Sequence, residues 1–358
     1  MPILAPDTTP VATLTRPAAT TLLRHAGFPE PRPRWGVRAY RVTYTTPGIG
    51  GVPVTASALV VLPRDRHRAL RTIVYEHGTL VRRRDAPSSG LDNYAAQAAT
   101  LIAAARGAAV VAPDYLGLGS GTGPTTYLHA ATEASASLDA VRAARAFAAR
   151  RGRTLSPRLD VVGFSQGGHA ALALDRAIEQ GADPALSVRT VASISGPLAL
   201  RAVELPAILA GRLDPRTSAY NLTYLLVAWA RVYPGLQPVA PARYAPLFDG
   251  RHGDQQVLRA MPPHIAQLLP PAALARLRTP AGPLLMALND ADAVCEWAPR
   301  ARVTLYAARV DSAVAYNNST ACAAALARHG VRARVVDLGR LDHFPSMFAG
   351  VPRWLRGA

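Results

Sequence analysis

The sequence predicts an α/β fold: a mostly parallel central sheet with helices on both faces, interrupted by a helical cap insertion. Short apolar segments typical of buried strands alternate with helical segments from about residue 71 to residue 195, and this alternation returns at residue 302. The stretch between them is rich in proline and short apolar helices and shows no clear strand. We therefore expect an N-terminal arm at residues 1–36, a main domain at residues 37–197 and 298–358, and a cap or lid at residues 198–297.

Length and composition suit a globular protein with a well-filled core. The chain has 358 residues, of which 49% are hydrophobic and 18% are charged, so one large domain with an insertion is expected. No apolar run reaches the roughly 18 residues of a membrane span. The first twenty residues lack a basic segment followed by an apolar core, so no signal peptide is visible. The expectation is a soluble protein, secreted if a signal peptide was removed and cytoplasmic otherwise.

The charge and the cysteines exclude several classes of site. The formal charge is +17, and all basic residues counted in it are arginines. They are scattered and not interleaved with aromatic residues, which favours a solvated surface over a specific nucleic-acid site. Cys295 and Cys322 are too few for a zinc site, and the sequence leaves open whether they form a disulfide. The oligomeric state also stays open.

The elements expected before the insertion follow in chain order. The arm contains a short helix at residues 18–25, and strands at residues 35–44 and 52–63 form an antiparallel hairpin. Further strands are expected at residues 71–75, 108–112, 159–162 and 190–195, and helices at residues 94–106, 132–150 and 170–178. His77, Asp114 and Ser165 each follow a strand. Since the carboxyl ends of parallel strands share one rim, these residues should lie on the same side of the sheet.

The elements after residue 197 divide between the insertion and the end of the sheet. Helices in the insertion are expected at residues 205–211, 219–233, 255–267, 271–278 and 283–288. A helical insertion in such a domain is most simply a cap over the strand ends, and a separate helical domain is the alternative. The last strands are expected at residues 302–307 and 331–338, with helices at residues 318–329 and 345–355.

A Gly-x-Ser-x-Gly motif at residues 163–167 stands between a predicted strand and a predicted helix. This context is typical of a nucleophile elbow, a sharp turn that requires small residues around the serine. Gly163 and Gly167 meet that requirement. Ser165 would stand at the start of the helix, where the N–H of Gln166 can stabilise an oxyanion. The simpler interpretation is a glycine-rich turn that only caps a helix.

A nucleophilic serine needs a histidine base and an acid that orients the base. In elbow enzymes the chain order is serine, acid, histidine. Ser165, Asp311 and His343 follow that order, and Asp311 and His343 come after the last two predicted strands. The weaker candidates for the acid are Asp290, Asp292, Asp337 and Asp342. For His343 the alternative is a loop histidine without a role.

The remaining site residues concern the oxyanion and the substrate. A second oxyanion donor is expected in the turn after the early strand, where the N–H of His77 or of Thr79 is available. The insertion carries large apolar residues, of which some are expected in its own core and others at the strand ends, where they would line an acyl pocket: Leu225, Leu226, Val227, Trp229, Leu268 and Leu269. The individual residues expected in a substrate pocket are Tyr115, Phe164, Tyr224 and Trp229.

Five motifs together resemble a known family: Tyr-Glu-His-Gly-Thr (75–79), Pro-Asp-Tyr-Leu-Gly-Leu-Gly (113–119), Gly-Phe-Ser-Gln-Gly-Gly (163–168), Val-Asp-Ser-Ala-Val (310–314) and Asp-His-Phe (342–344). From about Tyr40 onward the chain resembles the α/β-hydrolase fold, and within it the secretory lipase-like branch that includes the fungal lipase A type. The resemblance implies a carboxylic-ester hydrolase that uses no cofactor or metal, acts on small-molecule or lipid esters, and carries its triad on Ser165, Asp311 and His343.

Two other functions stay open. A serine peptidase or amidase could use the same scaffold, and a binding protein could have kept the fold without catalysis. The intact order of the triad favours an enzyme.

Overall fold

A nine-stranded sheet forms the centre of the computed structural model, which describes residues 7–29, 31–236, 239 and 241–357. The strands are β1 (Thr8–Leu14), β2 (Val37–Pro47), β3 (Pro53–Pro63), β4 (Ala69–Glu76), β5 (Ala109–Pro113), β6 (Thr154–Phe164), β7 (Ser187–Ile194), β8 (Arg302–Ala307) and β9 (Arg334–Asp337). Their order is β1-β2-β3-β5-β4-β6-β7-β8-β9. The pairs among β1, β2, β3 and β5 are antiparallel, and every pair from β5 to β9 is parallel. The expected mostly parallel sheet is confirmed.

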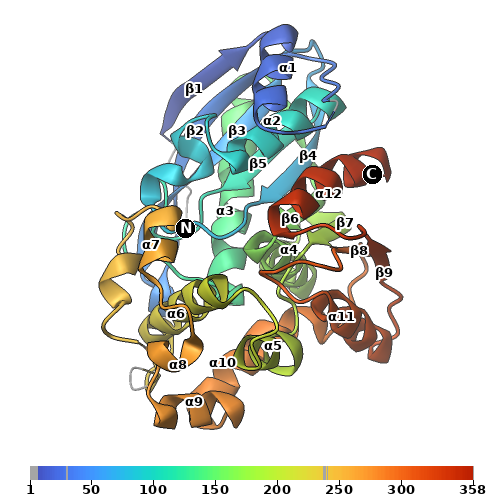
Figure 1. The fold of residues 1–358 in the computed structure, drawn as a ribbon. Coiled ribbons are helices and arrows are strands. Elements are labelled where there is room, and N and C mark those ends of the chain that lie inside the picture. Colours follow the sequence, from blue (N-terminus) through green and yellow to red (C-terminus); the bar gives the residue numbers. More distant parts are fainter. Residues whose placement is uncertain (1–6, 30, 237–238, 240, 358) are drawn as a thin grey trace.

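Helices cover both faces of this sheet (Figure 1). On one face lie α1 (Arg16–His25), α2 (Tyr94–Arg106) and α12 (His343–Gly357), and on the other lie α3 (Ala130–Ala149), α4 (Gln166–Ala177) and α11 (Asn317–Arg328). The strands show why both faces are apolar. In β4, Ile73 and Tyr75 pack against the first group of helices, while Val74 between them packs against the second. This is the alternation of a strand that is buried on both faces.

The ends of α2 show how local sequence sets a helix boundary. The side chain of Asn93 accepts a hydrogen bond from the N–H of Ala96 at 2.8 Å and so caps the first turn. Gly107 ends the helix in a left-handed conformation, with φ of 61°. The observed bounds, Tyr94–Arg106, are those expected from the sequence.

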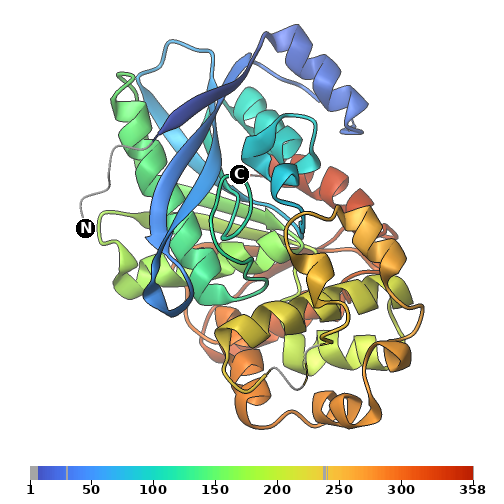
Figure 2. The same ribbon diagram turned by 90° about the vertical axis from the view of Figure 1, so that its left-hand side faces the viewer.

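The described residues between β7 and β8 form helices joined by loops, with no strand. The helices are α5 (Leu205–Leu209), α6 (Pro215–Val232), α7 (Asp254–Ala260), α8 (Ile265–Leu268), α9 (Pro271–Arg278) and α10 (Gly282–Asp292). Short helical turns are η5 (Leu200–Glu204), η7 (Ala245–Phe248) and η8 (Ala293–Cys295) here, and η1 (Ile49–Gly51), η2 (Arg83–Asp85), η3 (Pro87–Ser89) and η4 (Ile178–Ala182) elsewhere. The insertion gathers below the sheet in both views (Figures 1 and 2). The division of the chain at residues 197 and 298 remains a prediction.

Two expectations about local structure need correction. The N-terminal arm is not only a packed arm with a helix, because Thr8–Leu14 pairs with β2 as the edge strand of the sheet. Residues 1–6 of that arm lie outside the described residues. The helix expected at residues 255–267 is two helices, α7 and α8, because Pro262 and Pro263 interrupt it and proline cannot continue a helix.

A disulfide joins Cys295 in η8 to Cys322 in α11, with their Cα atoms 5.3 Å apart. Both cysteines are buried. The bridge therefore fixes the C-terminal end of the insertion to a helix of the main domain and answers the question that the sequence left open. No described helix is long and apolar enough to cross a membrane.

Candidate active site

Ser165 stands on a strained turn between β6 and α4. Its φ of 55° and ψ of −122° are unusual for a residue with a side chain. This backbone conformation is kept because the surrounding backbone leaves no room for a wider turn. A Cβ at Gly163 would overlap the carbonyl of Gly167, and a Cβ at Gly167 would overlap the carbonyl of Glu76. Both glycines therefore have the close approach that an elbow requires.

Three side chains from separate parts of the chain form a continuous hydrogen-bonded row. Nε2 of His343 lies 2.9 Å from Oγ of Ser165. Nδ1 of His343 lies 2.9 Å from Oδ2 and 3.0 Å from Oδ1 of Asp311. Ser165 follows β6, Asp311 follows β8 and His343 begins α12. The parallel strands end on one rim, which brings together residues that are far apart in sequence.

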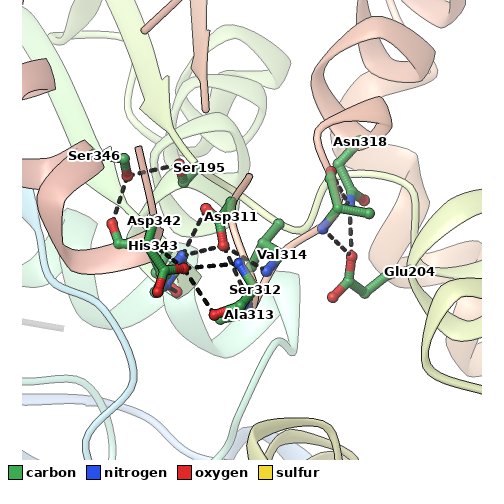
Figure 3. A network of polar contacts seen from close by, with 12 residues as sticks. Ser195, Glu204, Asp311, Ser312, Ala313, Val314, Asn318, Asp342, His343 and Ser346 are labelled. Atoms are coloured by element: carbon green, nitrogen blue, oxygen red, sulfur yellow. Dashed lines mark hydrogen bonds and ion pairs between the residues drawn. The ribbon is translucent and has the colours of Figure 1, made fainter. Parts of the chain in front are cut away.

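The backbone around Asp311 holds its carboxylate toward His343. The N–H groups of Ala313 and Val314 each donate to Oδ1 of Asp311 at 2.9 Å. Asp342 makes different contacts, because its Oδ1 accepts from the N–H and the hydroxyl of Ser312, at 2.8 and 2.7 Å, and from the N–H of His343 at 2.8 Å. It therefore joins the two loops and leaves the imidazole to Asp311 (Figure 3).

The other aspartates considered for the acid make contacts elsewhere. Asp337 pairs with Arg309 at 2.6 Å. Asp292 accepts from the N–H of Leu200 at 2.6 Å, and Asp290 is in α10 of the insertion.

His343 is fixed by its own backbone as well as by its ring. The hydroxyl of Ser346 donates to the carbonyl of His343 at 2.6 Å and lies 2.8 Å from the hydroxyl of Ser195, which follows β7 (Figure 3). The ring of Phe164 packs on the imidazole with centroids 4.8 Å apart. The histidine that follows the last strand is thereby anchored to a neighbouring strand end.

Two backbone segments lie beside the Ser165 hydroxyl and offer N–H groups. The helix α4 begins at Gln166, and the N–H groups of a first helical turn have no intrahelical acceptor. The turn of His77 and Thr79 follows β4, and the overlap of a Gly167 Cβ with the carbonyls of Glu76 and His77 shows that this turn touches the elbow. The two expected sources of an oxyanion hole are thus adjacent.

The side chains of this turn differ in exposure. His77 is fully buried, and burial lowers its pKa to about 4 despite the nearby carbonyls of Gly78 and Asp114. Its ring packs against that of Tyr115 with centroids 4.3 Å apart and the planes tilted by 31°, and the hydroxyl of Tyr115 donates to the carbonyl of His77 at 3.2 Å. Thr79 instead lines the cavity in front of Ser165. His77 and Tyr115 therefore support the turn from behind.

A cavity of about 920 Å³ opens in front of Ser165 and His343. Leu80, Tyr94, Phe164 and Phe344 are apolar or aromatic residues of its lining, and the rings of Phe164 and Phe344 lie against His343. The insertion contributes Tyr220 and Leu258 together with polar side chains, namely Thr217, Asn221, Gln255, Gln256 and Arg259. Arg82, Asp85, Asn93 and Asp254 add further polar groups. The cavity is thus apolar beside the nucleophile and polar toward the insertion.

Comparisons with known proteins agree with this architecture. Residues 87–242 match the secretory lipase family model. The rice cell wall degrading esterase LipA from Xanthomonas oryzae is 27% identical, with a TM-score of 0.84 over 99% of this chain and 96% of that one. A Legionella pneumophila protein is 21% identical over 99% of this chain and 96% of that one (TM-score 0.87). Candida antarctica lipase A is 16% identical over 94% of this chain and 76% of that one (TM-score 0.69). No curated protein sequence matches.

Residues 87–242 thus resemble the secretory lipase family, and the chain as a whole has the α/β-hydrolase fold. The family match and the esterase at 27% identity make it an ester hydrolase of the carboxylesterase and lipase class. The matched residues include Ser165 and the first part of the insertion, and they end before Asp311 and His343.

Most of the pocket residues expected from the sequence do not line the cavity of this hydrolase. Phe164 does, but Tyr115, Tyr224 and Trp229 are absent from the lining. The ring of Tyr224 stacks on Tyr127 at 4.5 Å, and its hydroxyl donates to the carbonyl of Leu80 at 3.1 Å. Nε1 of Trp229 donates to the carbonyl of Tyr127 at 3.1 Å. A buried tyrosine or tryptophan usually pairs its polar atom with an acceptor. Tyr224 and Trp229 find carbonyl acceptors in the core, and these contacts hold their rings away from the cavity.

The expectation that some large apolar residues of the insertion line the pocket also needs correction. All of them are buried in the core of the insertion: Leu225, Leu226, Val227, Trp229, Leu268 and Leu269. The helix faces that meet the cavity carry mostly polar residues.

Sequence reasoning missed a buried polar network behind the nucleophile. Glu133 of α3 accepts from Nε2 of Gln166 at 2.8 Å through one oxygen and faces Nδ1 of His169 at 2.6 Å through the other. Nε2 of His169 lies 3.0 Å from the carbonyl of Ala291 in α10. Burial opposes the charged imidazole, but the adjacent Glu133 carboxylate raises the pKa of His169. Both ring nitrogens face acceptors, an arrangement that favours the protonated imidazole.

The sequence signal for this network is faint. Glu133 and His169 are both polar residues on otherwise apolar helices, but many such residues point to solvent, and only packing shows that they meet.

Proposed function

We propose that this chain hydrolyses carboxylic esters of short- to medium-chain acids through an acyl-enzyme formed on Ser165. The observation that carries the proposal is the unbroken row from Oγ of Ser165 through the imidazole of His343 to the carboxylate of Asp311. A serine hydroxyl is a weak nucleophile unless a base accepts its proton, and a base works only when it is correctly oriented.

The reaction follows from these contacts. Oγ of Ser165 attacks the ester carbonyl carbon while Nε2 of His343 takes the hydroxyl proton, which gives a tetrahedral oxyanion. The oxyanion collapses, the ester C–O bond breaks, and His343 gives the proton to the leaving alcohol. Water then attacks the acyl-enzyme in the same way, His343 again accepts and returns a proton, and the acid leaves. Asp311 keeps a hydrogen on Nδ1, so that Nε2 is free to act as the base, and stabilises the imidazolium.

The oxyanion would be stabilised by backbone N–H groups from two segments. We propose the N–H of Gln166 as one donor, because it is the first amide of α4 and has no intrahelical partner. For the second donor the N–H of Thr79 is favoured over that of His77, since Thr79 lines the cavity and His77 is fully buried.

Residues 198–297 are proposed as a cap that sets the substrate preference. The apolar wall beside Ser165 suits a short acyl chain, and each buried methylene would favour binding by about 0.8 kcal/mol. The polar side chains from the insertion limit how far an apolar chain can extend, which supports short to medium lengths. The test uses Leu258→Ala, in the cavity lining, and Met286→Ala, whose side chain is 50% exposed on α10, as its control.

We expect Leu258→Ala to lower the octanoate-to-acetate ratio of kcat/KM about threefold. This is slightly less than the effect of removing one methylene of the acyl chain from contact with the cavity wall. Met286→Ala should leave the ratio unchanged. Equal ratios in both variants would mean that the insertion does not set the chain length.

The ester hydrolase proposal is tested by a p-nitrophenyl ester series from acetate to palmitate, together with matched amide substrates and a fluorophosphonate label. We expect turnover of the shorter esters, little amide hydrolysis, and labelling that Ser165→Ala abolishes. Amide turnover equal to ester turnover would indicate a peptidase or amidase. A wild-type protein that is neither active nor labelled would indicate a binding protein.

Secretion is the proposed destination. The matching family is described as secretory, and the buried Cys295–Cys322 disulfide is typical of proteins in oxidising compartments. Thiol titration of the protein purified from the culture medium and from the cytoplasm would test this, and free thiols in the native, active form would contradict it.

A further inference from the structure

Glu204 is a buried carboxylate at the end of η5, where the insertion meets the loop that carries Asp311. One oxygen of its side chain, Oε2, accepts two hydrogen bonds, from the N–H of Ala315 at 3.1 Å and from Nδ2 of Asn318 at 2.6 Å. The residue is 5% exposed. Asn318 is itself held, because its Oδ1 accepts from the N–H of Ala199 at 3.0 Å.

The Asp311 loop uses successive amides to bind two carboxylates. The N–H groups of Ala313 and Val314 donate to Asp311, and the next amide, that of Ala315, donates to Glu204. The insertion contacts the same loop a second time, since the N–H of Asp214 donates to the carbonyl of Ser312 at 2.8 Å. The conformation that presents Asp311 to His343 is therefore supported from the insertion.

The charge of Glu204 also acts on the proposed triad. Burial raises the pKa of Glu204 to about 7, against the lowering effect of the hydrogen bonds from Ala315 and Asn318. The charge of Asp311 raises this pKa further, and that of His343 lowers it. Tyr127, which precedes α3 in the main domain, is another titratable group that interacts with the charge of Glu204. Glu204 thus changes its charge near neutral pH beside a pair whose charge changes during the reaction.

We propose that Glu204 is a positioning residue of the hydrolase: it fixes the Asp311 loop from the insertion and, when ionised, stabilises the His343 imidazolium. This inference rests on the proposed function, because it assigns His343 as the base. The sign of the effect follows from charge. A negative Glu204 favours the positive imidazole of the transition state, so its contribution is present above about pH 7 and is lost as the pH falls below that value.

Glu204→Gln separates charge from geometry. Both hydrogen bonds end on the same oxygen, Oε2, so the amide oxygen of glutamine can accept both while the negative charge is removed. The measurement is kcat/KM for p-nitrophenyl acetate from pH 5.5 to 8.5 in wild type and variant. We expect the wild-type to variant ratio to rise from about one at pH 5.5 to about threefold at pH 8.5, which corresponds to about 0.65 kcal/mol at 1.36 kcal/mol per tenfold change.

The control is Asp292→Asn, because Asp292 at the end of α10 holds the other end of η5. Asp292 accepts from the N–H groups of Leu200 and Arg201 and so also anchors η5, and its strongest charge interactions are with His169 and Arg201. Its wild-type to variant ratio should not change with pH. A flat ratio for Glu204→Gln, or an equal rise for Asp292→Asn, would overturn the inference.

A second readout keeps the two proposals distinguishable. The rate of fluorophosphonate labelling at Ser165 requires the nucleophile and its base but no ester turnover, and its ratio between wild type and Glu204→Gln should show the same rise with pH. A wild-type protein that is not labelled refutes the proposed function. A labelled protein with a flat ratio refutes only the role of Glu204.

Discussion

Asp311→Asn should inactivate the enzyme by fixing His343 in the wrong tautomer. In the wild type, Oδ1 of Asp311 accepts from the N–H groups of Ala313 and Val314, both at 2.9 Å. An asparagine must place its oxygen there, because its NH₂ group cannot accept a hydrogen bond. The NH₂ group then takes the position of Oδ2 and faces Nδ1 of His343, which lies 2.9 Å away.

The consequence can be followed atom by atom. An NH₂ donor opposite Nδ1 requires Nδ1 to be the acceptor, so the imidazole hydrogen moves to Nε2. Nε2 faces Oγ of Ser165 at 2.9 Å and can no longer take its proton. Loss of the correct tautomer costs on the order of 10⁴-fold in kcat. The two backbone hydrogen bonds are kept, so the variant should fold with a melting temperature within a few degrees of the wild type.

Asp342→Asn is the matched control, since Asp342 is adjacent to His343 and accepts three hydrogen bonds at 2.7 to 2.8 Å. Its amide oxygen can keep them, so we expect less than about a tenfold loss, within the range of one weakened hydrogen bond. The assay is steady-state hydrolysis of p-nitrophenyl butyrate with thermal melts of both variants. An Asp311→Asn variant with more than about 1% of wild-type kcat, or a larger loss for Asp342→Asn, would refute the assignment of the acid.

Three further predictions concern the nucleophile, the disulfide and the buried network. Ser165→Ala should lower kcat on the order of 10⁴- to 10⁶-fold in a protein that still folds, because the turn already carries a Cβ; a variant with a tenth of wild-type activity would exclude Ser165 as the nucleophile. Replacing Cys295 and Cys322 by alanine should lower the free energy of unfolding by about 3.5 kcal/mol, from the loop-closure entropy of a 27-residue separation. Denaturant titration measures this, and a loss below about 1 kcal/mol would show that the bridge does not stabilise the fold. Glu133→Ala should lower the free energy of unfolding by about 3–5 kcal/mol, because it removes one partner of the buried Glu133–His169 pair. The exposed carboxylate of Glu296 provides the control, whose alanine variant should change stability by less than about 1 kcal/mol.

The sequence by itself determined the order of elements and the rim on which the proposed triad lies. Short apolar strands that alternate with apolar helices allow few arrangements, since each face must be covered. Gly163 and Gly167 around Ser165, and the positions of Asp311 and His343 after later strands, were enough to predict that these side chains would meet. Such predictions succeed because local pattern and strand direction fix them.

The tertiary structure alone decided what surrounds that row of residues. Tyr224 and Trp229 look like pocket residues in the sequence, but each has a polar atom that pairs with a carbonyl in the core. Pairs such as Glu133 with His169, or Glu204 with Ala315, join positions that are more than thirty residues apart and follow no sequence period. Whether a polar side chain on an apolar helix is solvated or buried depends on what packs over it, and the packing of the whole chain determines that.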